Sequence, residues 1–144
     1  MRTKEFLSRL DNDRIVRAIG AAEALTSGEI RVYLKRGEID DTLKAAREQF
    51  EKLGMTATRE RNGVLIFVAP RSQKFAVIGD EGIHQRCGES FWQQLVEGMQ
   101  NFFKAENFTD AVVHAIQRTG ELLAQEFPRQ PDDRDELPNA VETG

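Results

Sequence analysis

The feature that most constrains the fold is a run of six consecutive apolar residues at 64–69, Val-Leu-Ile-Phe-Val-Ala. The run is short and rich in β-branched and aromatic side chains, which favour extended backbone. A strand without polar alternation has both of its faces covered, as in a parallel or mixed sheet between helices. The sequence therefore predicts a central buried strand with other elements packed on both sides.

Two further strands are predicted beside this run. In residues 29–35 the apolar side chains of Ile30, Val32 and Leu34 alternate with polar neighbours, which is the period of a strand. Residues 74–78 follow a turn at 70–73 and form a hairpin with the central strand. Because a helix joins the first two strands, we expect them to be parallel with a right-handed crossover, and the third to run back.

Four segments carry apolar residues at helical spacing. The capping residues expected to begin three of them are Asn12 or Asp13, Asp40 or Asp41, and Asn107. The apolar faces are Ile15, Val16, Ile19, Ala22 and Leu25; Leu43, Ala46, Phe50 and Leu53; Phe91, Trp92, Leu95, Met99, Phe102 and Phe103; and Val112, Ala115, Ile116, Thr119 and Leu122. The predicted order is α-β-α-β-β-α-α, an α/β fold with a small mixed sheet and helices on both faces.

The length of 144 residues suits a single domain. We assign residues 1–127 to that domain and residues 128–144, rich in Pro, Asp, Arg and Glu, to an extended acidic C-terminal tail. The net charge of -4 argues against general nucleic-acid binding. No apolar run approaches the ~20 residues of a membrane span, and the N-terminus lacks a signal-peptide core. We therefore expect a cytoplasmic protein without a membrane anchor.

The predicted topology brings three turns to one edge of the sheet. The end of the third strand, at residues 79–82, should lie beside the starts of the other two, at residues 27–29 and 61–63. The metal ligands predicted there are Glu29, Asn62, Asp80 and Glu81, and the neighbours predicted to bind a ligand are His84, Arg31 and Arg61.

Carboxylate, amide and backbone carbonyl oxygens are the ligands of hard cations, so Ca²⁺ or Mg²⁺ is the cofactor expected at this edge. Acidic residues and glycines are also ordinary components of solvated turns, and that alternative stays open. No EF-hand loop is present. At the opposite edge, Glu38, Asp40 and Asp41 face the turn at 70–72, and we interpret them as helix-capping residues.

Catalytic motifs are weak in this chain. There is no Gly-x-Gly-x-x-Gly, Walker loop or nucleophile elbow, so no nucleotide cofactor is expected. Cys87 lacks the downstream arginine of a cysteine phosphatase loop, and we interpret it as a plain thiol. His84 is predicted in a loop near the proposed site, either as a ligand or as a surface residue. Residues 11–13 precede a helix rather than follow a strand, which favours capping over an aspartate nucleophile.

Four segments in this order resemble the TPM domain family: Thr26–Ile30, Arg61–Leu65, Ile78–Ile83 and Phe91-Trp92. Residues 135–139, Asp-Glu-Leu-Pro-Asn, are similar to the end of stand-alone soluble bacterial members. The resemblance covers nearly the whole chain and implies a compact α/β sandwich with a small central sheet. The founding plant member of the family is a thylakoid-lumen protein implicated in photosystem repair.

The resemblance also implies two activities suggested for the family, a weak acid phosphatase activity and, in some members, calcium binding. Many members have Gly-Tyr-Gly-Leu-Glu where this chain has Gly-Asp-Glu-Gly at 79–82, so a site built on the common pattern is expected to be altered here. The N-terminal signal and C-terminal membrane anchor of many members are not found, so an envelope or lumen role is not expected.

Three functions follow from these observations. We expect a divalent-cation binding module that acts in protein interaction or assembly with an unidentified protein partner. The alternative is a metal-dependent acid phosphatase acting on phosphoesters, in which Asp80 and Glu81 hold the metal and Arg31 or Arg61 binds phosphate. An assembly or repair factor, by analogy with the plant relative, is the third. Whether the protein is an enzyme stays open.

Overall fold

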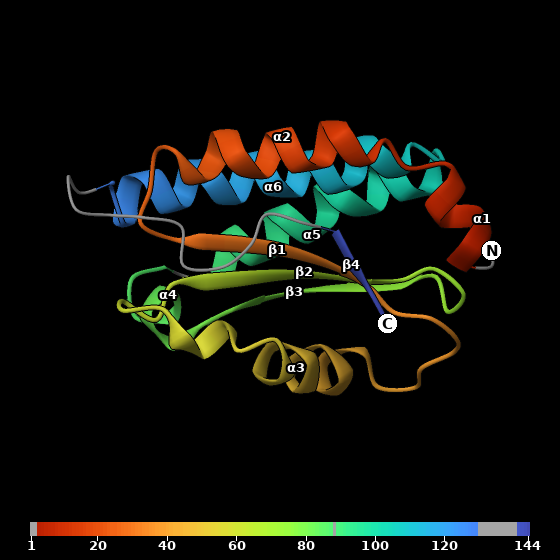
Figure 1. Cartoon of the computed structure of the whole chain (residues 1–144), viewed down its shortest axis with the longest axis horizontal. Helices are drawn as coiled ribbons and strands as arrows, with labels where there is room; N and C mark the ends of the chain where they lie inside the picture. Colours follow the sequence, from red (N-terminus) through yellow and green to blue (C-terminus); the bar gives the residue numbers. More distant parts are fainter. Residues whose placement is uncertain (1–2, 88, 130–140) are drawn as a thin grey trace.

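The computed structural model describes residues 3–87, 89–129 and 141–144, and it shows a mixed four-stranded sheet in the order β3-β2-β1-β4 (Figure 1). The apolar run lies in β2, which pairs with β1 in parallel and with β3 in antiparallel orientation, as predicted. The strands are β1 Glu29–Leu34, β2 Gly63–Ala69, β3 Lys74–Gly79 and β4 Val141–Thr143.

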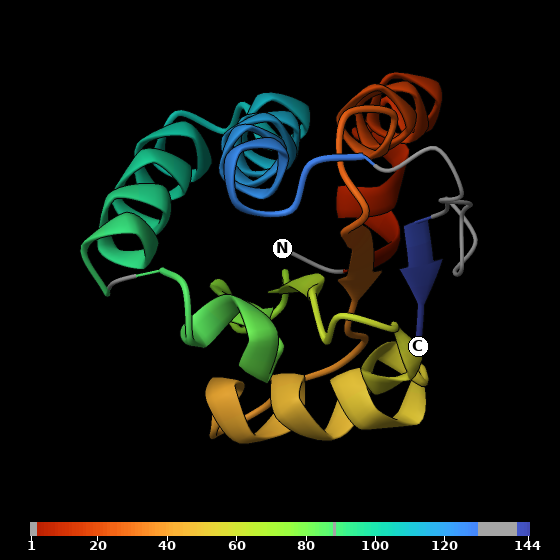
Figure 2. The ribbon, with the colours of Figure 1, turned by 90° about the vertical axis from the view of Figure 1, so that its left-hand side faces the viewer.

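Helices cover both faces of the sheet (Figure 2). On one face lie α2, α5 and α6, and on the other lie α3 and the short turn η1. The short helices α1 and α4 and the 3-10 turn η1 were not predicted, because each has only three to six residues. The bounds are α1 Thr3–Ser8, α2 Asn12–Glu23, α3 Thr42–Lys52, η1 Met55–Ala57, α4 Glu81–His84, α5 Glu89–Lys104 and α6 Phe108–Glu126.

Strand alternation divides the interior into two clusters. Val64, Ile66 and Val68 of β2 face the three-helix side and are buried against α2 and α6. The intervening Leu65 and Phe67 face α3, where they pack with Phe50, Met55 and Tyr33 among others. Both faces of β2 are therefore apolar and covered, which is the reason that its sequence shows no alternation.

The observed N-terminal caps of α2 and α6 differ from the predictions. Asp11, rather than Asn12 or Asp13, caps α2, and its carboxylate accepts a hydrogen bond from the Arg14 backbone N–H at 3.1 Å. Asp41 caps α3 in the same way through the Lys44 N–H, as predicted. Asn107 occupies the N-cap position of α6 but its side chain makes no capping hydrogen bond. The described residues include no helix that is both long and apolar enough to cross a membrane.

The β4 strand was not predicted. Its three residues come from the segment assigned to the tail, and they pair in parallel with Val32–Leu34 of β1. The Arg31 side chain, 6% exposed, forms an ion pair with Glu142, whose side chain is 33% exposed. At the start of β1 the Glu23 carboxylate accepts the Ile30 backbone N–H at 2.8 Å. The outer edge of β1 is thus covered, as is usual for strand edges in soluble folds. The Asp-Glu-Leu-Pro-Asn segment at 135–139 lies outside the described residues.

We predict that Glu142→Gln lowers the free energy of unfolding by about 2 kcal/mol, because it leaves the buried Arg31 guanidinium without its carboxylate. Thermal melting at constant pH should show a midpoint about 5 °C lower. Glu121→Gln is the matched control, since Glu121 pairs with Arg118 on an exposed helix surface and should change the midpoint little. Equal midpoints for Glu142→Gln and the unmodified chain would contradict a stabilising role for β4.

Candidate functional site

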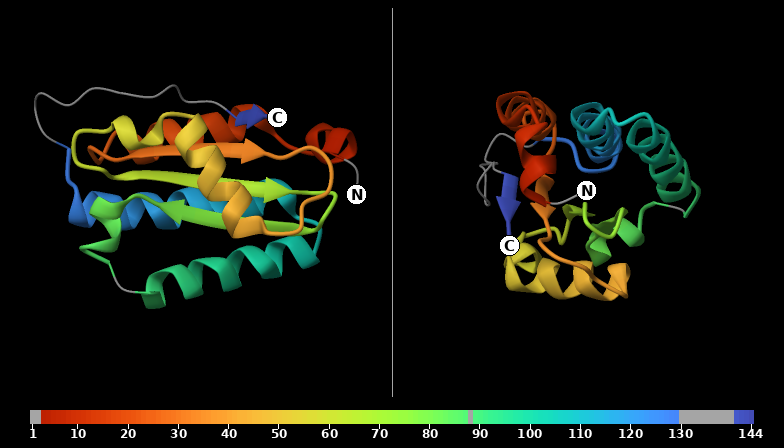
Figure 3. Two further views of the ribbon diagram at one scale, coloured as in Figure 1. Left: turned by 90° about the horizontal axis from the view of Figure 1, so that it is seen from below. Right: turned by 90° about the vertical axis from the view of Figure 1, so that its right-hand side faces the viewer.

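The predicted meeting of three turns is present at the end of the sheet beside α4 (Figure 3). The Glu29 N–H donates to the Asn62 carbonyl at 3.4 Å, and the Asp80 N–H donates to the Gly63 carbonyl at 3.0 Å. The Gly82 N–H donates to the Arg61 carbonyl at 2.9 Å. Backbone hydrogen bonds therefore connect the starts of β1 and β2 with the end of β3.

An ion pair between Arg61 and Asp80 lies at the centre of this edge. The guanidinium donates from Nε to Oδ2 at 2.8 Å and from Nη2 to Oδ1 at 2.9 Å, which is the two-point geometry that arginine forms with carboxylates. Oδ1 also accepts the Glu81 backbone N–H at 2.8 Å. The hydrogen bond to Asp80 raises the pKa of Arg61, and the charges of Asp80 and Glu81 add to the effect. The pair therefore holds both oxygens of Asp80.

The two partners differ in exposure. The Asp80 side chain is 5% exposed, whereas that of Arg61 is 42% exposed. Arg61 has a φ of 53°, in the left-handed region that few residues other than glycine adopt. Glu81, 65% exposed, lies 3.7 Å from the same guanidinium. The carboxylate is thus fixed inside the turn, while its counter-charge faces solvent.

A glycine is required beside this pair because two backbones approach closely. A Cβ atom on Gly82 would lie 2.3 Å from the Glu60 carbonyl oxygen and 2.6 Å from that of Arg61. Such distances are well inside van der Waals contact, and backbone atoms cannot turn aside as a side chain can. Because residue 82 has no side chain, α4 can pack directly against the turn before β2.

A second polar group joins the predicted residue Asn62 to Ser27 and Glu60, which were not predicted as site residues. The Ser27 hydroxyl donates to the Glu60 carboxylate at 3.0 Å. The Asn62 amide nitrogen donates to the Ser27 oxygen at 3.1 Å and to Glu60 at 3.4 Å. Asn62 is buried, and its backbone N–H donates to the Thr58 hydroxyl at 3.1 Å. The Asn62 amide thus acts through its nitrogen, as a donor that links two turns.

Of the remaining predicted residues, Arg31 and His84 direct their side chains to other partners, whereas Glu29 lies at the same edge, where its N–H donates to the Asn62 carbonyl. Glu29 is buried at the start of β1, opposite Gly63 in the strand register. Arg31 points to Glu142 and to the Leu53 carbonyl, which is 3.4 Å from its Nη1. His84 is exposed on α4, with its ring centroid 6.1 Å from that of Trp92. The predicted residues that lie together at this edge are therefore Glu29, Arg61, Asn62, Asp80 and Glu81.

The donor types at this edge suit a hard cation, but their arrangement is not that of a preformed site. Across residues 3–87, 89–129 and 141–144, no three His, Cys, Asp or Glu side chains are grouped to hold a metal ion. Both Asp80 oxygens accept hydrogen bonds from Arg61. A cation that used this carboxylate would have to replace the guanidinium.

Neither Cys87 nor the acidic turn at the opposite end of the sheet has the features of a reactive site. Burial raises the pKa of the Cys87 thiol, and the charge of Glu126 raises it further, which is the opposite of an activated cysteine. At the opposite edge Arg71 pairs with Glu38 at 3.5 Å, and the Ser72 hydroxyl accepts the Ile39 N–H at 2.9 Å. With Asp41 as a helix cap, these contacts join two turns.

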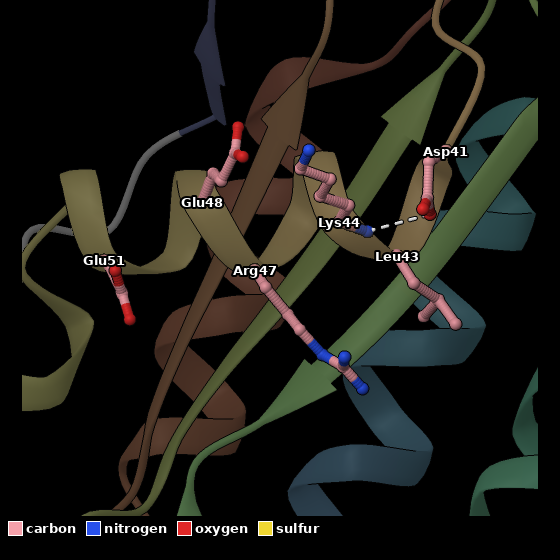
Figure 4. A pocket seen from close by; sticks show the side chains of 6 residues that line it. All are labelled: Asp41, Leu43, Lys44, Arg47, Glu48 and Glu51. Carbon is pink, nitrogen blue, oxygen red and sulfur yellow. Dashed lines mark hydrogen bonds between the residues drawn. The ribbon is translucent and has the colours of Figure 1, made fainter.

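A hollow of ≈ 350 Å³ lies on the outer surface of α3 (Figure 4). Its side chains point away from one another along the helix, and Asp41 is already used as the cap. The lining residues are Asp41, Leu43, Lys44, Arg47, Glu48 and Glu51. Because no polar groups converge there, the sheet-end site remains the stronger candidate.

Comparison with known proteins agrees with the fold. A model of the TPM domain matches residues 1–122. The chain is similar to the BA42 protein from the psychrophilic bacterium Bizionia argentinensis, with 41% identity, a TM-score of 0.86 and 92% of each chain covered. The N-terminal domain of the cg2496 protein from Corynebacterium glutamicum shares the fold, with 12% identity, a TM-score of 0.61, and 86% of this chain and 77% of that chain covered. No curated protein sequence matches.

We predict that Gly82→Ala destabilises the protein by about 1–3 kcal/mol, because the added methyl group forces two backbone segments apart. Urea unfolding monitored by circular dichroism measures this loss. Gln85→Ala, at an exposed position just after α4, should stay within about 0.5 kcal/mol of the unmodified protein. A Gly82→Ala protein as stable as the Gln85→Ala control would show that α4 is not held by close backbone contact.

Proposed function

Since the chain belongs to the TPM domain family, we propose that it is a binding module whose sheet-end site accepts a divalent cation in exchange for the Arg61 side chain. The observation that carries the proposal is the Arg61–Asp80 pair at the meeting of three turns. It combines a buried carboxylate with a counter-charge that solvent can reach.

Electrostatics explains why such an exchange is favourable. A carboxylate that is 5% exposed needs a positive partner, because burial of an unpaired charge is costly. The Arg61 guanidinium can move into water, which hydrates it, because its side chain is already 42% exposed. Ca²⁺ or Mg²⁺ offers a doubly charged replacement that prefers oxygen ligands. Asp80 and Glu81 would hold it, with Glu60, Asn62 and Glu29 in the same three turns as further candidate ligands.

Exchange also connects the cation to a protein partner. Once released from Asp80, the Arg61 guanidinium can form a two-point pair with a carboxylate of another protein. The cation would thereby control an arginine at the protein surface. This is the physical basis on which we propose a role in protein interaction or assembly.

A metal-dependent phosphatase is the second candidate, and one contact favours it. The Ser27 hydroxyl donates to Glu60 next to Arg61, so a hydroxyl, a carboxylate and a cationic group share one edge. Arg61 is the predicted phosphate ligand that fits this edge, whereas Arg31 is held by Glu142. No histidine is hydrogen-bonded to the Ser27 hydroxyl among the described residues, and a carboxylate is a weaker general base than the histidine that usually activates a serine, which predicts slow turnover at most.

We predict that millimolar Ca²⁺ or Mg²⁺ raises the melting midpoint relative to EDTA. A cation at about a hundred times its dissociation constant stabilises the fold by about 2.7 kcal/mol, which is on the order of 5 °C or more here. Asp80→Asn should remove the shift. Arg61→Gln should enlarge it at subsaturating cation, because the internal competitor is gone.

Glu38→Gln is the matched control, because Glu38 is an exposed carboxylate paired with arginine at the opposite edge. Its cation response should equal that of the unmodified chain. If neither ion changes the melting midpoint of the unmodified chain or of any variant, the carboxylates at this end of the sheet are turn residues without a metal-binding role. If Arg61→Gln and the unmodified chain respond equally, a cation binds elsewhere and the exchange is wrong.

For the catalytic alternative, we compare the unmodified protein with the Asp80→Asn protein in the presence of Mg²⁺ or Ca²⁺. We predict that both release nitrophenol from p-nitrophenyl phosphate at the same rate. Absorbance over several hours measures it. Turnover that is lost in Asp80→Asn and in Ser27→Ala, but kept in Cys87→Ser, would instead establish the phosphatase.

A further inference from the structure

The end of the sheet opposite the Arg61–Asp80 pair has an open groove of ≈ 790 Å³. Its lining residues include the start of β3 and the C-terminal half of α5. Figure 3 shows that these two elements run side by side. The size of the groove falls in the range of small-molecule sites, roughly 300–1,000 Å³. The lining residues are Phe6, Thr42, Ala69, Pro70, Gln73, Lys74, Phe75, Val96, Gln100, Phe103, Lys104, Glu106 and Phe108.

Four phenylalanines from four different elements form the apolar part of the groove. The ring centroids of Phe6 and Phe108 are 4.7 Å apart, and those of Phe75 and Phe103 are 5.1 Å apart. Phe6 and Phe108 are buried, whereas Phe75 and Phe103 are only half-buried. The inner rings are thus packed by the chain itself, and the outer two leave apolar surface on the open side.

The charged groups at the mouth of the groove are chiefly basic. Lys74 and Lys104 are exposed, and within the part of the chain that the structure describes neither lies within ion-pair distance of a carboxylate. Lys74 donates one hydrogen bond to the Asp40 carbonyl at 3.3 Å, which leaves its charge uncompensated. The acidic residue of the lining, Glu106, has Arg9 as a cationic neighbour at 3.9 Å, outside the lining, so the two lysines outnumber the one carboxylate.

We propose that this groove binds a small amphipathic anion, a medium-chain fatty carboxylate, with its apolar chain against the phenylalanine rings and its carboxylate at Lys74 and Lys104. Charge complementarity selects the anion, since an alkyl ammonium of equal length would meet two like charges. The apolar surface selects a chain over a simple carboxylate, because each buried methylene strengthens binding about fourfold. This site is independent of the sheet-end site, which lies at the other end of the strands.

The test is calorimetric titration of the full chain with sodium decanoate below its micelle concentration. We expect saturable one-to-one binding, roughly 16-fold weaker binding of octanoate, which is two methylenes shorter, and no binding of decylammonium. The double variant Lys74→Glu with Lys104→Glu should weaken decanoate binding at least tenfold. Lys44→Glu with Lys52→Glu, exposed lysines of α3 that do not line this groove, is the matched control and should change nothing.

Gln100→Trp tests the groove without altering the buried rings, because Gln100 is an exposed lining residue and a tryptophan there fills the space. It should abolish decanoate binding and keep the melting midpoint. Asp80→Asn should bind decanoate normally, which separates this proposal from the cation site. Equal binding of decanoate and decylammonium, unchanged binding in the lysine double variant, or no binding at all would overturn the proposal.

Discussion

The parallel pairing of β1 with β2 is the constraint on which the rest of the molecule depends. Because both strands run the same way and β3 returns, the two strand starts and the end of β3 meet at one edge. The buried apolar faces of β2 require helices on both sides, which leaves the strand ends as the places where polar groups can gather. The Arg61–Asp80 pair and the close approach at Gly82 both follow from that meeting of turns.

The two ends of the sheet differ in chemistry for the same reason. At one end, short turns carry two hydrogen-bonded groups, one of Ser27, Glu60 and Asn62 and the other of Arg61 and Asp80. At the other, the β2–β3 turn meets the ends of longer helices, and aromatic side chains from α1, α5 and α6 gather around β3. The β4 strand pairs with the outer edge of β1, and its residue Glu142 forms an ion pair with the buried Arg31. Arg31 therefore stabilises the sheet and is part of neither site.

Local sequence patterns were enough to predict the three main strands, their directions and the four long helices. These elements depend on the spacing of apolar residues and on turn residues, which are both visible within a short stretch of sequence. The β4 strand could not be predicted, since three residues of a polar segment become a strand only by pairing with β1. Arg31 alternates like a solvated position, but in the fold its side chain is buried and contacts Glu142 and the Leu53 carbonyl, which are distant in the sequence. The strand order suffices to bring Asp80, Glu81, Arg61 and Asn62 to one end of the sheet, but the bidentate pairing and the contacts of Ser27 and Glu60 depend on side-chain geometry.

The most direct test of cation exchange is the NMR signal of the Arg61 Nε–H, which donates to Asp80 at 2.8 Å. In the cation-free protein the signal should be resolved and slow to exchange with water. During a Ca²⁺ titration it should lose that protection and move to the position of an exposed arginine, in step with shifts of the Glu81 and Gly82 amides. An Arg61 signal that stays protected while Ca²⁺ saturates the protein would contradict the account.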